Sequence, residues 1–73
     1  MSKGLGRIER AILGSLRRRR QGADVLTLAR HVFATRTPTR AQLESIRRAL
    51  RSLRHQGFVI VTPLHVVYWA VRP

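Results

Sequence analysis

The first third of the chain carries hydrophobic side chains at helical spacing. These positions, three or four residues apart, are Leu5, Ile8, Ile12 and Leu16. They predict a helix over about residues 5–19 with one buried stripe. The run Arg17–Arg20 falls in the last turn of this helix and just beyond it, where positive charge suits the negative end of the helix dipole. Gln21 and Gly22 then break the pattern, so the helix is expected to end there.

The next segment, ADVLTLARHVF, is shorter and predicts a second helix. Thr27 is the expected N-cap of this helix, over about residues 27–34. Val25 and Leu26, which precede it, are expected to pair with the edge of a sheet. The polar sequence ATRTPT follows and has the length and composition of a turn.

The third helix has the clearest start signal in the chain. Either Thr37 caps it with Pro38 at the first helical position, or Thr39 caps it and Gln42 completes a capping box; the box is favoured. Gly57 is expected to end it. The buried stripe of this helix, which is predicted to span 39–56, consists of Leu43, Ile46, Leu50 and Leu53.

After Gly57 the pattern changes from helical to strand-like. FVIVT and HVVYWAV are rich in β-branched and aromatic residues, and Pro63 lies in the connection between them, as in a β-hairpin. Both faces of this hairpin carry apolar side chains, including Tyr68 and Trp69, and a domain of 73 residues covers only one. A homodimer formed through the apolar hairpin or the first helix is the expected way to cover the other face.

Composition adds a strong charge to this α+β pattern. Lys and Arg number 15 against 3 acidic residues, a net charge of +12, and 44% of the residues are hydrophobic. The hydrophobic content is typical of a folded domain, and the charge points to nucleic acid as the partner. No cysteine is present, and no segment has the apolar length of a signal peptide or a membrane span. One cytoplasmic domain over residues 1–73 is expected.

Two segments resemble parts of known DNA-binding domains. ALRSLRHQGFV is similar to the junction between recognition helix and wing in MarR-like and related regulators, and LTLARHVF is similar to their second helix. The resemblance, together with the order of elements, implies a winged helix-turn-helix: three helices followed by a C-terminal β-hairpin with a short wing. It further implies a sequence-specific protein that binds double-stranded DNA, associates with the nucleoid and regulates transcription.

The outward face of the third helix is expected to contact this DNA. At about 100° per residue, Arg48 lies opposite the buried stripe, and Glu44 is the only acid available to pair with Arg47 or Arg48. Arg40, Ser45 and Arg48 are predicted to contact bases, with Arg51 and Arg54 on the backbone. The full predicted set is Arg36, Thr37, Thr39, Arg40, Glu44, Ser45, Arg47, Arg48, Arg51, Arg54 and, in the wing, His65.

Catalysis finds no support in the sequence. His31, His55 and His65 are spread over three elements without a metal-ligand spacing, and the chain offers no paired carboxylates or glycine-rich phosphate loop. We therefore expect no enzyme, metal, cofactor or small-molecule ligand. Two alternatives to a DNA-binding regulator stay open. One is an RNA- or ribosome-associated winged helix, and the other is a protein-interaction module that uses the apolar face of the hairpin.

Overall fold

The computed structural model describes residues 5–19, 21–63 and 66–69, without the side chains of Tyr68 and Trp69. Within these ranges the chain is rich in helix and has a small sheet. The elements are α1 (Arg7–Arg17), α2 (Val25–Val32), α3 (Arg40–His55), β1 (Val59–Val61) and β2 (Val67–Trp69). None of the helices in the described ranges is long and apolar enough to cross a membrane.

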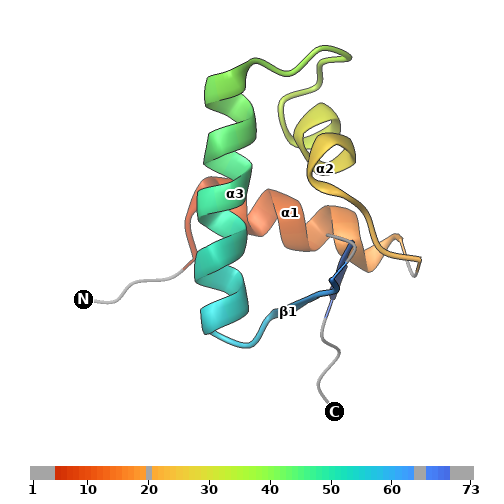
Figure 1. Ribbon diagram of the computed structural model, residues 1–73, viewed down its shortest axis with the longest axis vertical. Coiled ribbons are helices and arrows are strands. Elements are labelled where there is room, and N and C mark those ends of the chain that lie inside the picture. Colours follow the sequence, from red (N-terminus) through yellow and green to blue (C-terminus); the bar gives the residue numbers. More distant parts are fainter. Residues whose placement is uncertain (1–4, 20, 64–65, 70–73) are drawn as a thin grey trace.

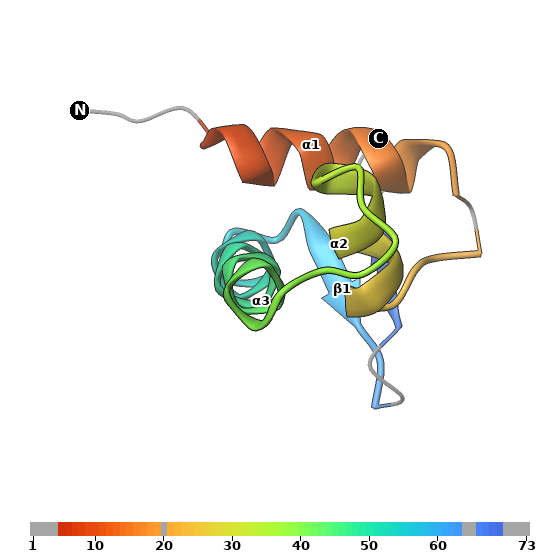
Figure 2. The same ribbon diagram turned by 90° about the horizontal axis from the view of Figure 1, so that it is seen from above.

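The three helices enclose the core together with the strands. Helix α1 crosses behind α3, and α2 packs beside both (Figure 1). Seen from above, α1 lies along one side of the molecule, and α3 and β1 lie on the other (Figure 2). The buried core consists of Ile12, Leu16, Ala23, Leu28, Ala29, Ile46, Leu50, Leu53, Val59 and Val67. Every element therefore contributes to one continuous cluster, and the predicted stripes of α1 and α3 both face it.

The sheet is formed by two antiparallel strands and one further bridge. Val59 pairs with Trp69 and Val61 with Val67. Ala23, which precedes α2, forms an isolated antiparallel bridge to Val67, with N–H···O distances of 2.9 and 2.8 Å. The residue that joins the sheet from this segment is thus Ala23, and the prediction that Val25 and Leu26 pair with a sheet edge was wrong. Both lie in the first turn of α2.

Helix α2 starts two residues earlier than predicted. Its N-cap is Asp24, whose Oδ1 accepts a hydrogen bond from the Thr27 backbone N–H at 2.8 Å. Hydrogen bonds from the Thr27 side chain and backbone lower the pKa of Asp24 below its usual 3.8. The expected cap at Thr27 was wrong, because a carboxylate three residues upstream satisfies the N–H that Thr27 itself carries.

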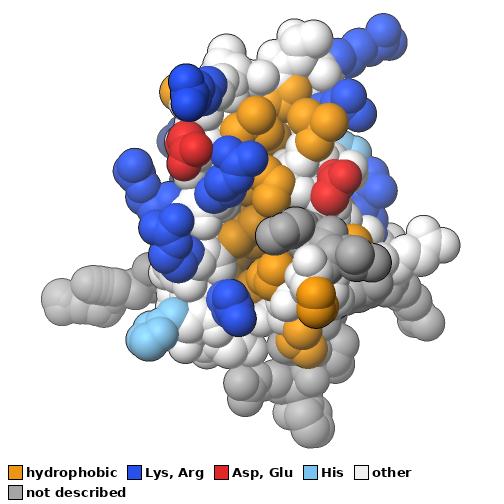
Figure 3. Space-filling model, in the orientation of Figure 1, with side chains coloured by type: hydrophobic (Ala, Val, Ile, Leu, Met, Phe, Trp, Pro, Cys, Tyr) orange, Lys and Arg blue, Asp and Glu red, His pale blue; other side chains and the backbone are white. Residues whose placement is uncertain are grey.

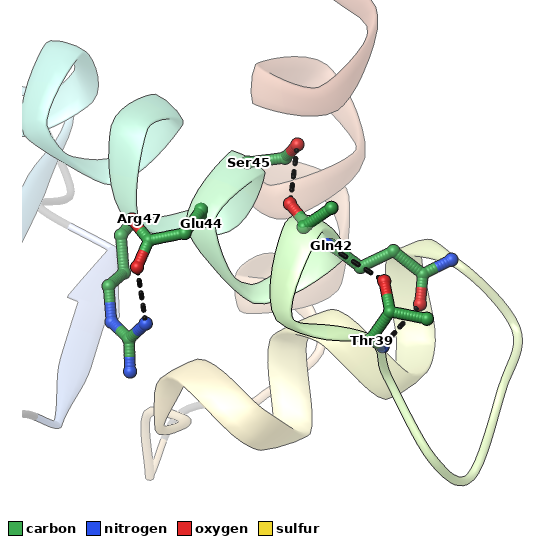
Figure 4. Close-up of polar contacts among 6 residues, drawn as sticks. Thr39, Gln42, Glu44, Ser45 and Arg47 are labelled. Atoms are coloured by element: carbon green, nitrogen blue, oxygen red, sulfur yellow. Dashed lines mark hydrogen bonds and ion pairs between the residues drawn. The ribbon is translucent and has the colours of Figure 1, made fainter.

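Helix α3 begins as the favoured alternative predicted. Thr39 Oγ1 accepts from the Gln42 N–H at 3.1 Å, and Gln42 Oε1 accepts from the Thr39 N–H at 2.9 Å (Figure 4). At the other end Gln56 is the C-cap and Gly57 has φ of 86°, a left-handed conformation that glycine adopts without steric cost. The capping box and the glycine stop are both confirmed.

Helix α1 lies inside its predicted range. Glu9 Oε1 accepts from the backbone N–H of Gly6 at 2.8 Å, which fixes the start of the helix at Arg7. The helix ends at Arg17, so Arg18 and Arg19 follow it directly. The arginines predicted at the C-terminal end of this helix therefore lie there, at the negative end of its dipole.

Candidate nucleic-acid interface

Helix α3 has two different flanks on either side of its buried stripe. One flank carries the small residues Ser45, Ala49 and Ser52, all half-buried, which line a shallow hollow with the start of α1. Ser45 also donates from Oγ to the Ala41 carbonyl oxygen at 3.0 Å. Figure 4 shows Ser45 on the side of α3 nearest α1, with Glu44 and Arg47 on another side. Ser45 was expected on the outward face, and the structure instead places it against a neighbouring helix.

The opposite flank carries four exposed arginines. At about 100° per residue they fall within an arc of about 60°. They are Arg40, Arg47, Arg51 and Arg54, here called the basic flank. A rise of about 1.5 Å per residue spreads them over about 21 Å of helix. In Figure 3, basic side chains gather along the side where α3 lies, beside hydrophobic side chains that run between α3 and α2. The basic flank is thus a linear array of cations, long enough to follow several phosphates of a duplex.

Few of these cations are neutralised within the chain. Glu44 Oε2 accepts from Arg47 Nη1 at 3.1 Å, with the two side chains 56% and 51% exposed, respectively. The other two acids, Glu9 and Asp24, accept backbone N–H groups at the starts of α1 and α2. With three acids against 15 cations, the surface stays strongly positive however the acids are paired. Such an excess of one sign attracts polyanions.

Arg48 lies apart from the basic flank. It is exposed and lines the same hollow as Ser45, together with Gly6 and Arg7 of the first helix. Arg48 therefore lies in the middle of the outward face of α3, and it lines the same hollow as Arg7 of α1. Arg7 was not predicted as a contact residue, because nothing in the local sequence shows which part of α1 will meet α3.

The turn between α2 and α3 presents Arg36 and Thr37, both exposed. Arg30 Nε donates to the Arg36 carbonyl oxygen at 3.2 Å, and Thr35 Oγ1 accepts from the Thr37 N–H at 3.2 Å. These two bonds hold the turn beside the start of α3. The Thr39 side chain caps the N–H of Gln42 and not those of residues 40 and 41. The latter two N–H groups point out of the start of the helix, where they could donate to an anion.

The last predicted contact residue is His65 in the wing, which lies outside the described residues, as does Arg20. The other two histidines, for which no site was predicted, are far apart in the sequence. His55 is exposed at the end of α3, and His31 belongs to α2, where its ring contacts Arg19. Within the described ranges no group of three or more His, Cys, Asp or Glu residues could hold a metal ion.

Two large apolar side chains are exposed among the described residues. Leu26 on α2 is 40% exposed and Ile60 on β1 is 56% exposed. Ile60 points away from the buried side of its strand, where Val59 is 3% exposed. The described part of the apolar surface is therefore small and divided between two elements.

Comparison with known proteins yields no match: no family model matches the sequence, and no curated protein or solved structure matches it.

Proposed function

We propose that this chain is a winged helix-turn-helix protein that binds specific sequences of double-stranded DNA through α3 and regulates transcription in the cytoplasm, at the nucleoid. The observation that carries the proposal is the basic flank, an exposed row of four arginines beside which Glu44 is the only acid of the helix. Repulsion within this row is relieved when a polyanion binds it, and a duplex provides phosphates in a line.

The order of the elements supports the fold named in this proposal. A helix, a bridging residue at Ala23, two helices and two antiparallel strands follow one another along the chain, and β2 lies between β1 and Ala23. In a winged helix the second and third helices form the helix-turn-helix, and the connection between the last two strands is the wing. We infer that β1 and β2 form this hairpin, with Thr62 and Pro63 entering the wing.

Exposed Ile60 supports a homodimer as part of the proposal. Its strand, β1, is at the edge of the sheet, where a second copy could cover the side chain. A dimer would present two copies of α3 to successive half-sites of a duplex. Sedimentation of the free protein tests this: a monomer at all concentrations contradicts it.

Titrations with labelled nucleic acids test the main proposal. Anisotropy measurements compare duplex DNA, duplex RNA and single strands of one sequence, from about 50 to about 200 mM salt. Glu44 already pairs with Arg47, so if the other three arginines each neutralise one phosphate, the slope of log affinity against log salt is about −2.7, an affinity loss of about 40-fold over this range. Equal affinity for all DNA sequences contradicts the sequence-specific part, and tighter binding to RNA contradicts DNA as the ligand.

A matched pair of variants locates the interface. Arg51→Gln removes one charge from the basic flank, and Arg10→Gln removes one from an exposed position of α1 that does not line the hollow beside α3. We expect Arg51→Gln to lower the salt slope by about 0.9 and Arg10→Gln to leave it unchanged. Equal effects of the two variants would show that the interface is not on the basic flank of α3. No duplex binding by the unaltered protein at low salt would contradict DNA binding altogether.

A further inference from the structure

A second basic surface lies between the C-terminal half of α1 and the end of α2. It is an open hollow whose floor includes Ala11, Gly14 and Ser15 of α1. Its walls include Arg18 and Arg19, which follow α1. No acidic residue is among the residues that line it, so its surroundings attract anions.

A hydrogen bond across the hollow fixes one of these arginines. Arg19 Nη2 lies 2.6 Å from His31 Nε2 and 3.3 Å from Nδ1, and the shorter contact is the hydrogen bond. Arginine has no acceptor, so it donates, and the accepting ring nitrogen carries no proton. A guanidinium has five N–H donors, and among the described residues the Arg19 side chain bonds only to His31. Because the side chain is already held in place, ordering it on a ligand costs less entropy than ordering a mobile arginine.

The floor of the hollow leaves room for a ligand to approach the backbone of α1 closely. Gly14 is exposed in the middle of α1, and a Cβ added there would meet nothing within 4 Å. Glycine lowers helix stability by about 1 kcal/mol relative to alanine, and α1 carries this residue at a position that no packing contact requires. A phosphodiester backbone could therefore lie close to the α1 surface between Arg18 and Arg19.

The hollow and the basic flank are on different sides of the molecule. The start of α1 packs near the small-residue flank of α3, and the basic flank faces away from it. Figure 2 shows α1 and α3 on opposite sides in the view from above. A straight duplex on the basic flank would leave the α1–α2 hollow open to solvent.

We propose that this hollow binds the phosphate backbone of a second duplex, so that one molecule bridges two nucleic-acid segments. The inference rests on the proposed function of α3 for the first segment. The alternative occupant, a free phosphate-containing metabolite, shares the chemistry of the site but cannot hold two duplexes together.

A bridging assay tests the inference. The full-length chain is mixed with a bead-bound duplex and a labelled duplex, and the labelled DNA recovered on the beads is measured. Gly14→Glu places a carboxylate in the hollow, and Gly14→Gln is its uncharged control of nearly equal size. Both side chains enter open space, so both variants should fold, which circular dichroism checks.

We expect the unaltered protein and Gly14→Gln to recover the labelled duplex, and Gly14→Glu to recover about tenfold less. Affinity for a single duplex should change by less than about twofold, since the α3 contacts are untouched. Arg18→Gln, which removes a positive charge from the wall, should also reduce recovery.

Four results would overturn the inference. The unaltered protein could bind one duplex but recover no second, which leaves the proposed function of α3 standing. Equal recovery by Gly14→Glu and Gly14→Gln would mean that bridging uses another surface, such as a dimer contact. Binding of neither duplex would remove the proposed function and the bridging together. In a last experiment, inorganic pyrophosphate is added and the chemical shifts of Gly14 are measured. Shift changes there, together with no bridging by the unaltered protein, would identify a small phosphate as the occupant of the hollow.

Discussion

Glu44 is the single acid beside the basic flank, and its removal tests how that surface works. Its Oε2 lies 3.1 Å from Arg47 Nη1, one helical turn along the same exposed face. In a complex with DNA this carboxylate would lie among phosphates while it holds one of the arginines that would otherwise contact them. Glu44→Gln keeps the size of the side chain and one acceptor oxygen, replaces the other oxygen by an NH2 donor, and removes the charge.

The expected magnitudes follow from the exposure of the pair. Both side chains are more than half exposed, so the ion pair stabilises the fold by about 0.2–0.5 kcal/mol at most, and the variant should melt within a few degrees of the unaltered protein. Freeing Arg47 adds about one phosphate contact, which steepens the salt slope by about 0.9. Between about 200 and about 50 mM salt, the affinity of Glu44→Gln should therefore rise about 3-fold more than that of the unaltered protein.

Anisotropy titrations at four or more salt concentrations measure both quantities. Arg47→Gln is the matched variant, because it breaks the same ion pair but removes the cation, so its slope should be shallower than that of Glu44→Gln. An unchanged slope in Glu44→Gln would show that Arg47 does not reach a phosphate. A loss of affinity confined to some sequences would show instead that Glu44 accepts a hydrogen bond from a base, as its position in the predicted contact set allows.

Three further predictions concern stability and use urea or thermal unfolding. Gly14→Ala should stabilise the protein by about 0.5–1 kcal/mol, since its Cβ enters open space, and a loss of stability would contradict the helix-interior assignment. Asp24→Ala should cost about 1 kcal/mol at neutral pH, whereas Asp24→Asn keeps the cap. Because hydrogen bonds from Thr27 lower the pKa of Asp24 from 3.8, its charged form stabilises the fold above about pH 4, and that contribution disappears as the pH falls through the lowered value; Asp24→Asn should lack this acid-dependent loss. Thr39→Ala should cost about 1 kcal/mol by removing the bond to the Gln42 N–H, and Thr39→Ser should restore most of it.

Local signals predicted α3 well because its determinants are close together in the chain. Thr39 and Gln42 satisfy each other's backbone N–H groups within one turn, and Gly57 supplies the left-handed residue that ends the helix. Helix α2 was harder because Asp24 and Thr27 are both good N-cap residues. The choice depends on Ala23, whose pairing with Val67 fixes the chain direction just before the helix. Val67 is far away in the sequence, so no local pattern reveals that contact.

In the candidate interface too, features set by local sequence could be predicted and features set by distant contacts could not. A helical period of about 100° per residue correctly exposes every arginine of α3, because exposure depends on the angle from the buried stripe. The helical period gives no information on which flank of the buried stripe will pack against another helix. It therefore could not predict that α1 covers the flank carrying Ser45, nor that Arg7 comes to lie near Arg48.

The asymmetry of α3 has a consequence for recognition. Small side chains at Ser45, Ala49 and Ser52 let the start of α1 approach this flank, and its presence leaves the basic flank as the side from which a duplex can approach. Phosphates are then the expected partners of the basic flank. Sequence preference would come from groups at the middle of the outward face, and Glu44 and Arg48 lie there. Ser45, which was predicted to contact a base, thus lies on the flank of α3 that faces the start of α1.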